Sequence, residues 1–155
     1  MNKIKIDPQR TVAALDRNVF GGFAEHLGRC IYGGIYDEGS PLTDEQGFRT
    51  DVIAALREMG MPIMRYPGGN FVSGYRWTDG IGPRAERPAR PELAWHTVEP
   101  NTFGTDEFVA WCRKVGTEPY IAVNCGDGDM REARDWVEYC NGTQNTYWAN
   151  RRRAN

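Results

Sequence analysis

Polar residues that could bind a small ligand follow apolar segments of the sequence, at the points where those segments end. Glu25 and His26 follow one segment, Arg65 ends another, and Asn70 comes after a Pro-Gly-Gly turn. An arginine beside such a turn is suited to holding a carboxylate through paired hydrogen bonds, and glycines let the backbone approach a ligand closely. Glu25 could accept hydrogen bonds from vicinal hydroxyls, while Asn70 could both donate and accept them. These residue types predict a polar site of the size of a sugar or polyol.

Aromatic side chains near these positions could supply flat apolar faces for a sugar ring. They are Tyr66, Tyr75, Trp77 and Trp95. The candidate residues also have structural interpretations: Glu25 as a surface charge or cap, Arg65 as a salt-bridge partner, and Trp95 as a plug that holds a long loop. His26 and His96 are single, unpaired histidines, and a structural role is favoured for both.

The elements that must position these residues alternate between strand-like and helix-like patterns. Strands are predicted at residues 3–6, 18–23, 62–66 and 119–124, and helices at 48–59, 105–115 and 129–140. The last strand is expected to be buried on both faces, and the last helix to bury Met130, Ala133, Val137 and Cys140.

This order of elements implies parallel strands joined by crossover helices. Neither a dinucleotide fingerprint nor a P-loop motif is present, so a nucleotide-binding sheet has no support. The long connections at 26–47 and 67–103 follow strands, which favours a parallel barrel whose strand-to-helix loops build the active face. A full barrel takes about 250 residues. Three repeats therefore predict either a small open sheet or the front part of a larger barrel.

Composition narrows the class of protein further. The 155 residues are expected to form one domain, and the formal net charge of −2 argues against a nucleic-acid partner. The basic run at 151–153 is interpreted as a solvated helix face or a fraying end. No apolar stretch is long enough for a membrane span or a signal peptide, so a cytoplasmic location is predicted. The four cysteines lack metal-ligand spacing and are expected to be reduced, buried thiols.

Several runs of residues resemble those of one enzyme family. FAEHLGR at 23–29, IYGGIY at 31–36 and RYPGGNFVS at 65–73 are similar to the α-L-arabinofuranosidases of glycoside hydrolase family 51. DGIGP at 79–83, LAW at 93–95, Asn101 with FGTDEF at 103–108, and EYCN at 138–141 continue the likeness in order. It extends over nearly the whole chain.

The resemblance implies an α/β fold, with this chain as about the first three βα repeats of a (β/α)8 TIM barrel. Residues 1–15 would be an N-terminal strand segment that joins a C-terminal β-sandwich absent here, and 16–155 a partial catalytic barrel. It further implies a retaining hydrolase that releases terminal arabinofuranose from arabinan and arabinoxylan, using two carboxylates about 5–5.5 Å apart. No metal or organic cofactor is expected. The partner is an arabinose-containing oligosaccharide, and a homo-oligomeric whole protein is left open.

By the same resemblance, four residues belong to the sugar pocket and none breaks bonds. Glu25 and Asn70 would bind arabinose hydroxyls, Arg65 would lie under the nucleophile and keep it ionised, and Trp95 would line the pocket toward the leaving group. The family carries its acid/base in an Asn-Glu dipeptide ending the fourth strand and its nucleophile at the seventh. The chain contains no Asn-Glu dipeptide, so both catalytic glutamates are expected beyond Asn155 and the chain is interpreted as an inactive N-terminal fragment.

Two alternatives stay open. The chain could be a non-catalytic carbohydrate-binding module, or the whole protein could be a related endoglucanase or β-xylosidase of the same family.

Overall fold

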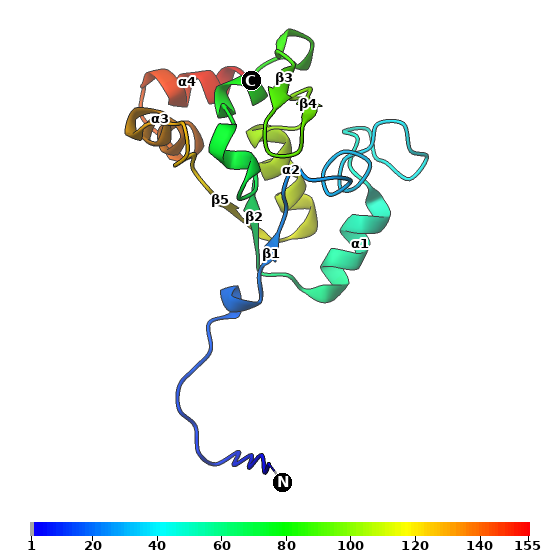
Figure 1. Cartoon of the computed structure of the whole chain (residues 1–155), viewed down its shortest axis with the longest axis vertical. Coiled ribbons are helices and arrows are strands. Elements are labelled where there is room, and N and C mark those ends of the chain that lie inside the picture. The colour runs from blue at the N-terminus through cyan, green and yellow to red at the C-terminus, as the bar shows by residue number, and fades with distance from the viewer. Residues whose placement is uncertain (1) are drawn as a thin grey trace.

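A three-stranded parallel sheet organises the protein, whose computed structural model describes residues 2–155 (Figure 1). The strands are β1 (Gly22–Phe23), β2 (Ile63–Tyr66) and β5 (Glu118–Ile121), in the spatial order β1-β2-β5. The helices are α1 (Thr50–Met59), α2 (Thr105–Val115), α3 (Met130–Asn141) and α4 (Tyr147–Ala154). The expected alternation of parallel strands and crossover helices is therefore confirmed.

The predicted strand at residues 3–6 is wrong. These residues form neither strand nor helix, and the segment before β1 extends away from the folded body (Figure 1). Ile4 and Ile6 are 92% and 86% exposed. An extended segment needs a neighbouring strand to pair its backbone groups, and no such strand lies beside it in residues 2–155.

The predicted strand at 18–23 is mostly a turn of 3₁₀ helix, η1 (Arg17–Phe20), followed by the two residues of β1. Asp16 starts this turn because its carboxylate accepts a hydrogen bond from the backbone N–H of Asn18 at 2.8 Å. Local capping thus overrides the apolar pattern of the segment.

Helix boundaries follow the predicted ranges closely. α1 and α2 end at Gly60 and Gly116, which adopt left-handed φ values of 64° and 83°. Asp129 caps α3 by accepting from the N–H of Glu132 at 2.8 Å. α2 begins at Thr105 as a helical residue, whereas its N-cap is Gly104, whose N–H donates to Glu107 Oε2 at 2.8 Å.

The long connection at 67–103 contains local structure. It forms the 3₁₀ helices η2 (Phe71–Gly74), η3 (Trp77–Gly80) and η4 (Arg84–Glu86), then an antiparallel hairpin of β3 (Arg90–Glu92) and β4 (Thr97–Glu99). The hairpin lies above the sheet in the view of Figure 1, and its Arg90 donates to Asp79 of η3 at 2.9 Å. This connection supplies most of the surroundings of the site described below.

Burial in the last βα unit differs from the prediction. Residues 118–120 of β5 are exposed, because no strand pairs with the free edge of β5 within residues 2–155. Met130 and Val137 are 91% and 57% exposed, and α3 buries Trp136 and Tyr139 instead. The helix packs through Trp136 onto Trp77, at a ring distance of 5.7 Å, which rotates the predicted stripe outward.

The basic run at 151–153 lies in α4, as its helical interpretation predicts. Arg152 is not solvated: it is half-buried and donates to the carbonyls of Tyr139 and Gly142. All four cysteines are free thiols, and Cys125 is exposed rather than buried. None of the helices described is long and apolar enough to cross a membrane.

Candidate functional site

Glu25 lies directly after β1 and holds the Pro-Gly-Gly-Asn turn that follows β2. Its Oε1 accepts hydrogen bonds from the N–H groups of Gly69 and Phe71, at 3.0 and 3.1 Å. Gly68 has a φ of 148°, and a Cβ there would lie 2.5 Å from Glu25 Cγ, so this turn and this carboxylate require glycine between them. The structure therefore brings Glu25 together with the turn that ends at Asn70.

Asn70 is exposed and lines a cavity of about 760 Å³. The cavity lies between η2 and the β3–β4 hairpin, and its other polar lining includes Arg76, Glu92 and Asn101. The Asn70 side chain makes no hydrogen bond to residues 2–155, which leaves its amide oxygen and nitrogen available to a ligand.

Arg65 lies in β2 and packs against Phe23 of β1. The two residues are register partners, and the guanidinium carbon lies 4.5 Å from the centre of the Phe23 ring. Within the described chain no carboxylate lies within 4.0 Å of this guanidinium, so the interpretation as a structural salt-bridge partner has no support there. Stacking on an aromatic face leaves the N–H groups of an arginine available for hydrogen bonds.

Trp95 lies in the turn of the β3–β4 hairpin. Its backbone N–H and that of Ala94 donate to the Glu92 carboxylate, at 2.5 and 2.7 Å. The side chain is half-buried and is not part of the lining of the cavity that Asn70 faces, whereas its neighbours Leu93 and Ala94 are. The structure thus joins Glu25 and Asn70 in one place but leaves Trp95 at the hairpin turn.

Three of the aromatic residues predicted to face a sugar belong to the core: Tyr66, Trp77 and Tyr75 are 0%, 1% and 5% exposed. The prediction is wrong for Tyr66 and Trp77, whose rings are covered by other aromatic rings; Tyr66, for example, stacks on Phe108 at 4.4 Å. Tyr75 is mostly buried but lines the cavity that Asn70 faces.

His26 is a buried structural residue, as predicted, and belongs to a polar network beneath the turn. Its Nε2 lies 3.0 Å from the hydroxyl of Tyr66. Its Nδ1 lies 3.0 Å from Glu99 Oε2, at ion-pair distance, although the ring N–H is not aligned for a hydrogen bond. Tyr32 donates its hydroxyl to Glu99 Oε1, and burial and the Glu99 charge both raise the pKa of Tyr32. His96 is exposed in the hairpin turn.

Glu99 was not among the residues that the sequence singled out. It is 6% exposed and also accepts the N–H of Asn101 at 2.8 Å. No local pattern marks it, because its partners come from segments 67 and 73 residues earlier in the chain. Only the packing of those segments reveals the network.

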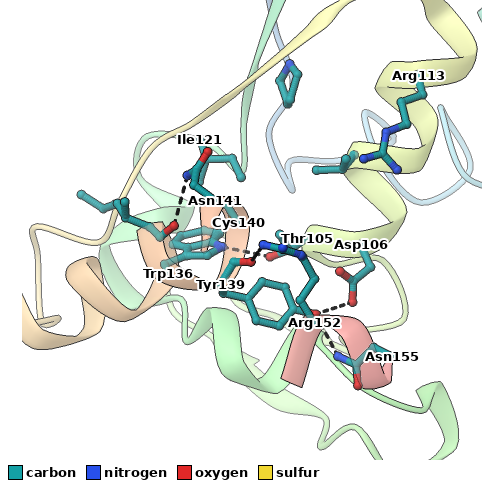
Figure 2. A pocket seen from close by; sticks show the side chains of 14 residues that line it. Thr105, Asp106, Arg113, Ile121, Trp136, Tyr139, Cys140, Asn141, Arg152 and Asn155 are labelled. Carbon is teal, nitrogen blue, oxygen red and sulfur yellow. Dashed lines mark hydrogen bonds between the residues drawn. The ribbon is translucent and has the colours of Figure 1, made fainter. Parts of the chain in front are cut away.

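A second hollow of about 750 Å³ runs along α2 and α3 on the helix side of β5. Figure 2 shows Tyr139, Asp106, Arg152 and Asn155 meeting there: Tyr139 donates to Asp106 at 2.7 Å, and Asn155 donates to Tyr139 at 2.8 Å. Burial raises the pKa of Asp106. These polar groups bond to one another, and none of Glu25, Arg65, Asn70 and Trp95 lines this hollow.

A three-stranded parallel βα sheet with polar groups on the loops after its strands defines an α/β protein. The model of the family described as "Alpha-L-arabinofuranosidase 1 domain" matches residues 55–155. The chain belongs to the α-L-arabinofuranosidases of glycoside hydrolase family 51.

Curated relatives and solved structures agree on this family. The chain is 60% identical over 152 residues to alpha-L-arabinofuranosidase C of Emericella nidulans, covering 98% of this chain and 30% of that protein. It is 52% identical to an intracellular exo-alpha-(1->5)-L-arabinofuranosidase of Halalkalibacterium halodurans, covering 95% and 29%.

Among solved structures, the GH51 enzyme of Thermotoga petrophila matches with a TM-score of 0.92 and 57% identity, covering 96% of this chain and 31% of that one. The Thermotoga maritima α-L-arabinofuranosidase in complex with arabinose matches with a TM-score of 0.88 and 59% identity, covering 89% and 29%. The chain thus spans about 30% of the length of the relatives that it matches.

Proposed function

We propose that this chain builds one side of the sugar pocket of an α-L-arabinofuranosidase that releases terminal arabinofuranose from arabinan and arabinoxylan. The observation that carries the proposal is the pairing of the Glu25 carboxylate with the turn that presents Asn70, at the edge of an open cavity. The arabinose complex of the T. maritima relative supports arabinose as the ligand.

In this proposal Glu25 and Asn70 recognise hydroxyl groups. Glu25 Oε1 already accepts two backbone N–H groups, whereas Oε2 accepts none from residues 2–155. Oε2 is therefore suited to accept hydrogen bonds from sugar hydroxyls, and the Asn70 amide adds a donor and an acceptor beside it. Trp95 would line the approach of the leaving group.

Arg65 would act on a carboxylate supplied from another part of the enzyme. Its guanidinium carbon lies over the Phe23 ring, without a carboxylate partner in the described chain. A nearby positive charge lowers the pKa of a carboxyl group and keeps it ionised, as a nucleophile requires. We place both catalytic carboxylates of the retaining mechanism in the parts of the relatives that this chain does not match. The intracellular H. halodurans relative supports a cytoplasmic location for the whole enzyme.

A hybrid enzyme tests this function. The 152 residues of the E. nidulans enzyme that match this chain are replaced by those of this chain, and the hybrid is assayed on p-nitrophenyl α-L-arabinofuranoside. We expect hydrolysis by the hybrid and none above the buffer blank by the 155-residue chain alone, because loss of both acid/base and nucleophile removes orders of magnitude in rate.

Hydrolysis by the chain alone would place the catalytic groups within it and contradict the proposal. An inactive but folded hybrid, together with arabinose binding by the chain alone, would favour a binding module. A substrate panel that includes β-xylosides and β-glucans separates the arabinofuranosidase from the related activities of the family.

A further inference from the structure

We propose that Glu99 is a positioning residue of the sugar site, because it holds His26 against the turn that carries Asn70 and joins that turn to the hairpin that carries Trp95. This inference rests on the proposed function for its ligand, but its structural part can be tested without a ligand.

Glu99 connects the loop after β1, which carries His26 and Tyr32, to the end of the β3–β4 hairpin. Its Oε1 accepts from the hydroxyl of Tyr32 and from the N–H of Asn101, the latter at 2.8 Å. Its Oε2 lies 3.0 Å from His26 Nδ1. With an exposure of 6%, the carboxylate is shielded from water and depends on these partners for stabilisation.

His26 transmits the position of Glu99 to the turn. Its imidazole stacks on the Phe71 ring, with centroids 4.4 Å apart and planes inclined by 18°. The N–H of Phe71 donates to Glu25, and Phe71 directly follows Asn70 in the sequence. Moving His26 would therefore displace Phe71, and with it the backbone that binds Glu25 and carries Asn70.

Glu99 also ends β4 and so sets the place of the hairpin. Glu92 and Thr97 are register partners across the hairpin, and Glu92 holds the N–H of Trp95. The Glu99 carboxylate thus fixes the end of the hairpin and also contacts His26. In this way it sets the position of Trp95 relative to Asn70. Glu99 lines the same cavity as Asn70 but makes no hydrogen bond to Asn70, so its effect on the position of Asn70 is indirect.

If Glu99 had only a general structural role, replacing it would lower the stability of the whole fold without loosening the turn selectively. Hydrogen-exchange mass spectrometry on the hybrid enzyme separates the two roles, since the Gly69 and Phe71 amides are protected by their bonds to Glu25. In Glu99→Ala we expect exchange in the peptide covering 68–74 to accelerate by about tenfold or more relative to α2, as loss of a buried hydrogen-bond partner allows.

Glu107→Gln is the matched control. Glu107 is 8% exposed and accepts from Gly104 and Arg87, but it contacts neither His26 nor the turn. We expect this variant to lower global stability with no selective effect at 68–74. Glu99→Gln keeps an acceptor for Tyr32 and Asn101 and should restore most of the protection.

Titration of the hybrid enzyme with arabinose, the ligand in the T. maritima complex, forms the second arm. We expect Glu99→Ala to weaken binding about tenfold, and Glu99→Gln to bind nearly as the unsubstituted hybrid. An unsubstituted hybrid that binds no arabinose would count against the proposed function, while the exchange experiment would still decide the positioning role.

Equal acceleration throughout the chain, or none at 68–74, would overturn the inference. If Glu99→Ala does not fold, Phe71→Leu removes the stack on His26 directly and should accelerate exchange at 68–74 by a similar factor. Unchanged exchange in that variant would likewise overturn it.

Discussion

At the scale of single residues, the two oxygens of Glu25 have different surroundings. Oε1 is bound to two backbone N–H groups of the turn, whereas Oε2 has no partner in the described chain. One carboxylate therefore holds the turn through Oε1 and keeps a second acceptor, Oε2, without a protein partner in the described chain. This division explains why a glutamate in a glycine-rich loop is more than a surface charge.

Substituting Glu25 by Ala in the hybrid enzyme should lower kcat/KM by an amount equivalent to about 1–3 kcal/mol, the usual effect of leaving buried polar partners unpaired. Azide should not restore activity, because azide replaces a missing nucleophile or acid/base and not a hydroxyl ligand. The measurement is steady-state kinetics on the aryl arabinofuranoside with and without azide. Glu38→Ala, which removes a surface carboxylate paired with Arg84, is expected to leave kcat/KM unchanged. Near-total loss with azide rescue and an arabinosyl azide product would identify Glu25 as catalytic.

Asp106 makes the stability of the chain depend on pH. Burial raises its pKa above the ordinary value of 3.8, so the folded state binds the proton more tightly than the unfolded state. Its contribution to the free energy of unfolding is thus full below the unfolded pKa and is lost as pH rises through the raised folded pKa. Asp106→Asn keeps an acceptor for Tyr139 but cannot ionise.

We therefore expect the stability of Asp106→Asn relative to wild type to improve as pH rises from about 3 to about 7. Urea unfolding of both proteins across this range measures the difference, in which the other titrating groups cancel. A difference that is independent of pH would contradict the assigned role of burial.

At the scale of elements, the connection from Gly82 to Gly104 is held on α2 by one buried ion pair. Arg87 and Glu107, whose side chains are 3% and 9% exposed, make two bonds of 3.0 Å. Arg87 also donates to the carbonyls of Gly82 and Asn101, while Glu107 completes the start of α2. The pair thus fixes the segment that carries the β3–β4 hairpin.

Replacing Glu107 by Ala should lower the free energy of unfolding by about 3–5 kcal/mol, since it leaves the Arg87 charge buried without a counter-charge. Chemical denaturation provides the measurement. Arg134→Ala, which breaks the exposed Arg134–Asp135 pair, should produce no measurable change. Equal effects of the two substitutions would show that the buried pair contributes no more to the free energy of unfolding than the exposed pair does.

At the scale of the whole molecule, the face around β5 is open. Tyr120, Met130 and Val137 are 52%, 91% and 57% exposed, and β5 presents an unpaired edge within residues 2–155. Exposed strand edges and apolar surfaces promote association between chains.

The 155-residue chain by itself should therefore self-associate and melt over a broad range of temperature. Tyr120→Lys places a charge on the edge strand and should shift sedimentation velocity profiles toward monomer at a given concentration. Thr78→Lys adds the same charge at an exposed position of η3, away from the sheet edge, and serves as the control. A monomeric wild-type sample with a sharp, cooperative melt would show the prediction to be wrong.

Local signals in the sequence determined the family, the parallel βα order and most helix ends. Gly60, Gly116 and Asp129 act through their own backbone and nearest neighbours, so their effect is visible without a fold. The association of Glu25 with the Pro-Gly-Gly-Asn turn could also be predicted from the sequence, because both follow parallel strands whose ends meet at one edge of the sheet.

Tertiary structure alone decided which faces are covered. Residues 3–6 and β5 have the apolar pattern of strands, but a strand needs a neighbour, and the described chain provides none beside residues 3–6 or on the free edge of β5. Tyr66, Tyr75 and Trp77 lie in the core because other aromatic rings pack on them. Met130 is exposed because the packing of Trp136 on Trp77 sets the rotation of α3. The role of Glu99 depends on contacts across 67 and 73 residues of sequence, which no local pattern encodes because burial and ion pairing arise only once those segments pack together.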